Sequence, residues 1–329
     1  MKFLNNIVAI FVIIIISFII IPLPAFLLDM MFILNITLSV LILMMTMYVK
    51  DALQFSVFPS MLLITTVFRL ALNISSTRLI LTKSGQAGQV IKTFGSFVLS
   101  GNIVVGFIVF LIIVIVNFLV ITKGSERISE VSARFKLDAM PGKQMAIDAD
   151  LSSGLISEEM ARTRRSDIQR EAEFYGAMDG ASKFVKGDAI ASIIITFINF
   201  VGGTIIGMVQ GGSSFNDVLT TYSIATVGDG LVSQLPALLI STATGMIVTR
   251  AASDASLSAD VSKQIFSQPT VLIVTGGAIA FLCLIPGMPI PQILLLSAAV
   301  IAAGLLVRKR QAMAQAVPAE GEAGGAKEP

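Results

Sequence analysis

Eight apolar runs, most of them long enough to cross a lipid bilayer, constrain this fold more than any other feature of the chain. A bilayer core of ~30 Å requires about twenty helical residues at 1.5 Å per residue. We expect spans at residues 7–28, 30–49, 56–72, 103–121, 189–209, 223–248, 270–285 and 290–307. The sequence therefore predicts an all-α integral membrane protein with about eight transmembrane helices.

The composition agrees and removes several classes of chemistry. Of the 329 residues, 55% are hydrophobic and only 13% are charged, which is too apolar for an ordinary soluble domain. The chain has no His, so it cannot form a Ser-His-Asp triad or an H-E-x-x-H zinc site. The single Cys283 rules out an intramolecular disulfide, and the net charge of +2 gives no support for nucleic-acid binding.

The distribution of Lys and Arg predicts the orientation. With the N-terminus inside, nineteen of the 23 Lys and Arg residues fall in inner segments, and three, Arg78, Lys83 and Lys92, fall in outer ones. Positive residues accumulate on the cytoplasmic side of membrane proteins. We therefore expect both termini in the cytoplasm, with residues 1–121 holding spans one to four and residues 189–307 holding spans five to eight.

The outer connection near residues 85–100 is amphipathic. Its apolar residues recur at three-to-four spacing, as on a helix: Val90, Ile91, Phe94, Phe97 and Val98. A helix lying in the membrane interface and an additional buried helix both fit this length.

Residues 122–188 form the one long polar segment between spans, and we expect it to be cytoplasmic. Ser157 followed by Glu158 and Glu159 predicts the start of a helix, because a hydroxyl caps free N–H groups and acidic residues favour the first turn. Its apolar stripe is thin, which suits a solvated helix or one packed against another subunit. Residues 308–329 have the composition of a flexible linker.

Two binding motifs fail on inspection. A phosphate loop ending at Lys143 needs Gly at position 137 and Ser or Thr at position 144, where the chain has Leu137 and Gln144. Asp148 and Asp150 resemble the start of a calcium loop, but Ser153 stands where that loop requires Gly. We favour a turn leading into the Ser157 helix.

Charged residues inside spans indicate function, because an unpaired charge at the bilayer centre costs ~3 kcal/mol or more. Arg69 and Asp229 are of this kind. Gly228, Gly230 and Pro236 surround Asp229, so we expect the helix to break there and expose backbone groups. The alternative is that Arg69 and Asp229 pair with each other or reach an interface.

Two further features flank the fifth span. Asp188 stands at its cytoplasmic edge, as a gate carboxylate or as a simple helix-start residue. A four-residue repeat of glycines permits close packing of another helix: Gly203, Gly207 and Gly211.

Three stretches carry a family resemblance. They are "ITKGSERISEVSARFKLDAMPGKQMAIDADLSSGLI", "REAEFYGAMDGASKFVKGDAIA" and "TVGDGLVSQLPALLISTATGMIVTR". The chain resembles the large export-gate membrane protein of the type III secretion family (FHIPEP) over residues 22–289. "ALNISSTRLIL" and "DGASKFVKGDAIA" are more similar to its flagellar branch than to its injectisome branch.

The resemblance implies a homo-oligomeric ring, nine-membered in the family, in the basal body of the bacterial inner membrane. Such a ring works with other export-apparatus membrane subunits and couples protein export to the proton or sodium motive force. The resemblance associates seven positions with gating or ion coupling: Arg78, Arg127, Arg134, Asp138, Lys183, Asp188 and Asp229. It implies no cofactor beyond the coupling ion.

Family members continue after the linker into a cytoplasmic domain that docks chaperones and exported proteins. Because this chain stops at the linker, we expect either a truncated form or a short natural relative. The favoured hypothesis is a non-enzymatic export-gate subunit in which H+ or Na+ at Asp229 or Asp188 changes the cytoplasmic segment. An injectisome gate and a stand-alone cation transporter remain alternatives.

Overall fold

The computed structural model describes residues 2–99, 102–209, 214–250, 256–284 and 289–315, and within these ranges it is helical with no strand. It divides into two units, 1–254 and 255–329. The first holds α1 (Lys2–Ile20), α2 (Ala25–Tyr48), the 3₁₀ helix η1 (Ala52–Phe55), α3 (Phe58–Thr82), α4 (Gln89–Leu99), α5 (Ile103–Val116), the π-helix η2 (Asn117–Thr122), α6 (Lys123–Asp138), α7 (Met140–Ser152), α8 (Glu158–Val209) and α9 (Phe215–Val248). The second holds α10 (Leu257–Ile265), α11 (Pro269–Phe281), the 3₁₀ helix η3 (Leu282–Leu284) and α12 (Ile290–Gln315).

Six helical stretches in the described residues are long and apolar enough to span a membrane: Ala25–Tyr48, Phe58–Thr82, Ile103–Ser152, Glu158–Val209, Phe215–Val248 and Ile290–Lys309. The pair α10 and α11, bent by 71°, gives a seventh if it counts as one span. The apolar stretch Ala9–Ile20 of α1 is shorter. The helical membrane class is therefore confirmed, whereas the predicted number of eight spans is not.

The first two spans meet at a different place from the one predicted. Helix α1 ends at Ile20 and α2 begins at Ala25, so the run 7–28 is interrupted in its last third. Pro22 and Pro24 explain the break, because proline lacks the N–H that a helix interior needs and restricts the residue before it. Pro24 itself has extended backbone, with φ −67° and ψ 150°.

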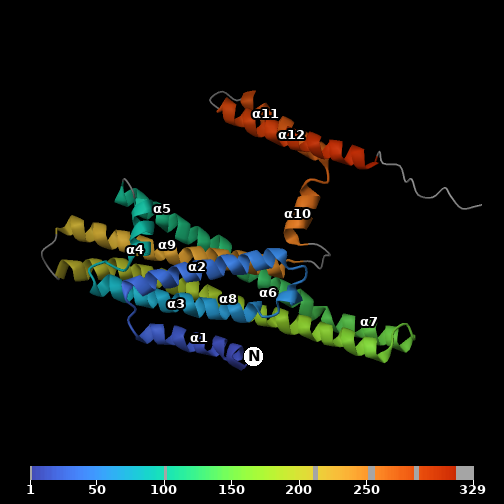
Figure 1. Cartoon of the computed structure of the whole chain (residues 1–329), viewed down its shortest axis with the longest axis horizontal. Coiled ribbons are helices and arrows are strands. Elements are labelled where there is room, and N and C mark those ends of the chain that lie inside the picture. Colours follow the sequence, from blue (N-terminus) through green and yellow to red (C-terminus); the bar gives the residue numbers. More distant parts are fainter. Residues whose placement is uncertain (1, 100–101, 210–213, 251–255, 285–288, 316–329) are drawn as a thin grey trace, which may run out of the picture. The chain divides into compact units, whose positions relative to one another are not determined.

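Helix α8 joins the polar segment to the membrane bundle without interruption. It has 52 residues, a length of about 78 Å at 1.5 Å per residue. It begins as predicted at Ser157, whose Oγ accepts a hydrogen bond from Met160 N at 3.2 Å. In Figure 1, α7 and the first half of α8 extend beyond the ends of α2 and α3. We call α6, α7 and residues 158–187 of α8 the arm.

Helix α9 is the centre of the first unit. It packs against α2, α3, α4, α5 and α8, and residues 225–233 are all buried. Residues 225–233 are buried on every side because the neighbouring helices surround this part of α9. The predicted break at Asp229 is wrong, because α9 runs unbroken through Asp229 and Pro236.

The glycines beside Asp229 serve packing instead. A Cβ on Gly228 would collide with the carbonyl oxygen of Ile91 on α4, and one on Gly230 would lie 2.8 Å from Cε2 of Phe110 on α5. Gly95 of α4 likewise faces the backbone of Ile224. Helix α9 can approach α4 and α5 this closely because its glycines, and Gly95 of α4, carry no side-chain carbon at the points of contact.

The repeat on α8 also meets α9. A Cβ on Gly203 or Gly207 would clash with the ring of Tyr222, and Gly207 also faces Val218. Gly211 lies outside the described residues.

The second unit is built around the contact of α11 with α12. Gly276 faces Ile301, Gly304 faces Ile273, and the Ser297 hydroxyl donates to the carbonyl of Gly276 at 2.8 Å. Small residues thus let these two apolar helices pack closely.

Replacing Gly228 with Ala should lower the stability of the first unit by about 1–3 kcal/mol, the usual cost of overpacking. The carbonyl of Ile91 belongs to a backbone and cannot swing aside. Thermal unfolding of the detergent-solubilised chain measures the loss. Gly245→Ala is the matched control, since it lies on the same helix with nothing within 4 Å of its Cβ position. Equal unfolding temperatures for both variants would contradict the packing role.

Candidate functional site

Three charged side chains are buried in the part of the chain that the structure describes: Arg69 on α3, Asp188 on α8 and Asp229 on α9. Each has 2–3% of its surface exposed. The three helices pack against one another, so the charges share one interior. Charges in such surroundings are costly unless they are paired, and they commonly mark function.

Arg69 pairs with Asp188, and the predicted alternative of an Arg69–Asp229 pair is wrong. Arg69 Nη2 donates to Asp188 Oδ2. Arg69 Nε and Nη1 and Asp188 Oδ1 have no hydrogen-bond partner within the described structure. Asp188 lies inside α8 rather than at a helix start, so its role as a helix-start residue is also excluded.

Asp229 has a neutral partner. Asn199 Nδ2 on α8 donates to Asp229 Oδ2 at 3.0 Å, while Asp229 Oδ1 accepts no hydrogen bond from the described residues. Asn199 is fully buried and lies eleven residues, about three turns, after Asp188. The two carboxylates therefore stand at different levels of the bundle. The only feature that could have singled out Asn199 beforehand is that it is an amide inside an apolar run.

The other predicted gating residues lie outside this interior. Lys183 Nζ bonds to Asp179 at 2.7 Å, and Arg127 Nη1 bonds to Glu130 at 2.7 Å, both within a helical turn and with both basic groups exposed. Arg134 and Asp138 approach to 3.9 Å at the surface. These four residues are on the arm.

Arg78, also a predicted gating residue, makes a different kind of contact from the four residues on the arm. Its Nη1 donates to the carbonyl of Ile20 at 2.9 Å, and Nη2 donates to Ile19 at 3.5 Å. The last carbonyls of a helix lack partners in the helix itself, and a cation there also meets the negative end of the helix dipole. Arg78 thus caps α1 from α3.

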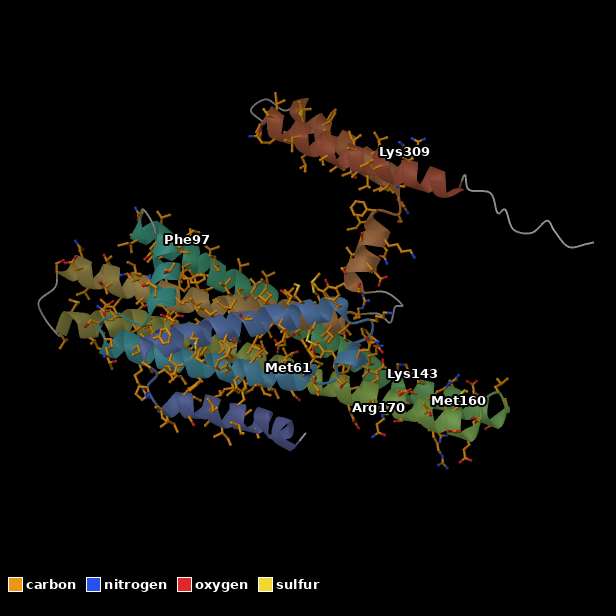
Figure 2. All side chains as sticks on the ribbon, viewed as in Figure 1. Met61, Phe97, Lys143, Met160, Arg170 and Lys309 are labelled. Carbon is orange, nitrogen blue, oxygen red and sulfur yellow. The ribbon has the colours of Figure 1, made fainter. Side chains whose placement is uncertain are left out.

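Ion pairs join the three helices of the arm to one another. Glu171 on α8 accepts from Lys136 on α6 at 2.7 Å and from Lys143 on α7 at 2.6 Å. Hydrogen bonding to Glu171 raises the pKa of Lys136. Burial acts to raise the pKa of Glu171, but the bonds from the two lysines outweigh it, so the pKa lies below its ordinary value. Figure 2 shows Lys143 where the arm leaves the bundle.

The stretch that resembles a calcium loop is helical. Asp148 and Asp150 lie within α7, where they pair with Arg165 at 2.5 Å and Arg164 at 3.1 Å on α8. No group of three His, Cys, Asp or Glu residues suited to a metal occurs in the described ranges. These aspartates fasten α7 to α8.

Removing one member of the buried ion pair should be costlier than removing both. Arg69→Met leaves Asp188 buried without a counter-charge and should destabilise the chain by about 3–5 kcal/mol. Adding Asp188→Asn should restore part of that loss, as measured by thermal unfolding in detergent. Strictly additive losses would show that the two side chains do not interact.

The Lys136–Glu171–Lys143 contact should weaken in acid. Because the pKa of Glu171 is lowered on folding from 4.5, its contribution is full above the unfolded value and is lost as the pH falls below it. Hydrogen exchange in α7, corrected for intrinsic rates, should increase between about pH 5 and pH 3. In Glu171→Gln this increase should be smaller. The same acid response in both proteins would rule out the contact as its cause.

The model of the FHIPEP family matches residues 15–328. The flagellar biosynthesis protein FlhA of Bacillus subtilis (strain 168) is 56% identical over 275 residues, which cover 84% of this chain and 40% of that protein. FlhA of Escherichia coli (strain K12) is 50% identical over 313 residues, covering 94% and 45%.

A relative with another name is equally similar. The low calcium response locus protein D of Yersinia pestis is 51% identical over 294 residues, covering 89% of this chain and 42% of that protein. The chain thus spans less than half the length of these curated relatives. No solved structure matches.

The family match over nearly the whole chain, with about 50% identity to FlhA proteins, confirms the resemblance carried by the polar segment and the Asp229 motif. The chain belongs to the FHIPEP family.

Proposed function

We propose that this chain is the membrane part of an export gate in a flagellar type III secretion apparatus. It acts as a non-enzymatic component that couples the proton or sodium motive force to protein translocation across the bacterial inner membrane. Family membership and the name of the flagellar relatives support the apparatus. The buried carboxylates support the coupling.

The observation that carries the coupling is the environment of Asp229. A carboxylate with 2% exposure has one amide donor and one oxygen without a partner among the described residues. Such a group is stabilised by taking up a cation, either a proton or a metal ion with oxygen ligands. The arrangement of α3, α8 and α9 around it then differs between the two charge states.

The path to the cytoplasm follows from α8. Three residues of α8 make the relevant contacts. Asn199 bonds to Asp229 of α9, Asp188 pairs with Arg69 of α3, and Glu171 pairs with Lys136 of α6. A shift of α8 at the carboxylates therefore moves the arm as well. In the proposal the arm of each subunit meets that of its neighbour in a ring, nine-membered by resemblance.

The proposed topology has eight crossings with both termini cytoplasmic, as the Lys and Arg distribution indicates. The arm is then cytoplasmic. In this topology α4 belongs to the outward-facing side of the inner membrane; its Ile91 is buried against Gly228 of α9, and its Phe97 is 80% exposed. Figure 2 labels Phe97 on α4, away from the arm. Other export-apparatus subunits and exported proteins are the proposed partners, and the coupling ion is the only proposed ligand.

Asp229→Asn tests the proposal directly. The amide keeps the size of the side chain but holds no negative charge, so we expect export of flagellar proteins to fall at least about ten-fold, a change of about 1.4 kcal/mol. Export is measured by immunoblotting culture supernatants of cells that carry the variant in the natural reading frame.

Asp217→Asn is the control, because Asp217 is on the same helix but exposed near its start. Normal export by Asp229→Asn, with normal amounts in the membrane, would remove Asp229 from the mechanism.

A further inference from the structure

Asn73 lies between the two buried carboxylates and contacts both of the helices that carry them. It is on α3 and is 1% exposed. Its Nδ2 donates to Ser192 Oγ on α8 at 3.0 Å, and its Oδ1 accepts from the Ser233 hydroxyl on α9 at 2.5 Å. Both ends of one amide thus join three helices.

The spacing along each helix is the same. Asn73 follows Arg69 by four residues, Ser192 follows Asp188 by four, and Ser233 follows Asp229 by four. Residues four apart lie on one helix face, about 6 Å apart. Each member of the bridge is therefore one turn from a buried charge on its own helix.

The Ser233 hydroxyl has a choice between two acceptors. Its oxygen is 2.5 Å from Asn73 Oδ1 and 2.8 Å from the backbone carbonyl of Asp229. A hydroxyl has one proton, so it can make only one of these bonds at full strength. A movement of α9 against α3 near Asp229 would change which acceptor the Ser233 hydroxyl favours. Through Asn73 it would also change the hydrogen bond to Ser192.

Other charges near α9 are in different surroundings. Of the charged residues on helices packed against α9, Asp29 on α2 and Glu126 on α6 are partly exposed, and Lys92 on α4 is exposed. Arg69 and Asp188 are the fully buried partners on α3 and α8. The side chains that join the three helices one turn from these charges are neutral: Asn73, Ser192 and Ser233.

We propose that Asn73, with Ser192 and Ser233, is a positioning bridge through which a change of charge at Asp229 alters the Arg69–Asp188 ion pair. The bridge rests on the proposed function in that Asp229 exchanges a cation, and it adds the residues that connect the two carboxylates. Its contribution is hydrogen bonding rather than volume.

A second buried asparagine provides the control. Asn35 on α2 is fully buried, and neither of its amide atoms has a hydrogen-bond partner within the described structure. Asn35→Leu and Asn73→Leu therefore remove the same groups from the same kind of interior. Only the second removes a link between α3, α8 and α9.

The experiment titrates Asp229 with protons in the reconstituted chain by infrared difference spectroscopy. Its carboxylic acid band is identified as the one lost in Asp229→Asn. In the wild-type background, Asp188→Asn should shift the titration midpoint by at least about 0.7 pH unit, roughly five-fold in proton affinity, the lower end of coupling between linked sites. In the Asn73→Leu background this shift should fall below half, and in Asn35→Leu it should persist.

An equal shift in all three backgrounds would mean that the coupling acts through space, and it would overturn the bridge. The bridge would also be overturned if Asp188→Asn left the titration midpoint of Asp229 unchanged, or if the Asp229 band did not titrate. If Asn73→Leu does not fold, Ser192→Ala takes its place, with Ser192→Thr expected to restore the shift because it keeps the hydroxyl. The readout is independent of export, so the bridge and the proposed function can fail separately.

Discussion

The structure depends on the contact between Arg69 of α3 and Asp188 of α8, because a charge in an apolar interior must be compensated where it stands. Neither side chain reaches solvent. The pair fixes the level at which α3 crosses α8, and the amide of Asn73 repeats the connection one turn further on and extends it to α9. Apolar packing alone does not fix such a register, since apolar side chains interchange with lipid at little cost.

The ion pair uses only part of the hydrogen-bonding capacity of its two side chains. Arg69 Nε and Nη1 and Asp188 Oδ1 lack partners among the residues described, as does Asp229 Oδ1. Other buried polar atoms of the first unit also lack a partner among the described residues, for example both amide atoms of Asn35 and the hydroxyl of Tyr222. What sets the interior of α3, α8 and α9 apart is its charge, because Arg69, Asp188 and Asp229 are the charged residues that are buried in the described part of the chain.

Helix α8 connects the buried carboxylates to the arm without a break, so it can transmit a shift from one to the other. A separate cytoplasmic loop, joined to the fifth span by flexible residues, would have absorbed a shift at Asp188. The structure instead has a continuous helix from Ser157 into the bundle, with Glu171 tied to α6 and α7. The exposed ion pairs of the arm are individually weak, since such pairs contribute about 0.2–1 kcal/mol each. The arm can therefore rearrange its contacts while α8 stays intact.

Sequence reasoning succeeded where the signal is local. The apolar runs predicted the helical membrane class, though not the number of spans, and Ser157 with Glu158 and Glu159 predicted the start of α8. It failed where a tertiary contact decides: Gly228 and Gly230 looked like a helix break, but they make room for Ile91 and Phe110. Likewise, nothing in the sequence links Arg78 to the carbonyls of α1, or Asn73 and Asn199 to the two carboxylates.

The proposed control of the arm by the charge at Asp229 requires that the distance between arm and bundle depends on that charge. Spin labels at Leu155→Cys, in the turn before α8, and Val57→Cys, before α3, report arm against bundle in a Cys283→Ser background; both sites are exposed. Asp229→Asn should change the mean distance by about 2 Å or more, the scale of helix shifts in switching proteins, and should abolish its dependence on pH. Identical distance distributions and an unchanged pH dependence in the two proteins would contradict the proposed control.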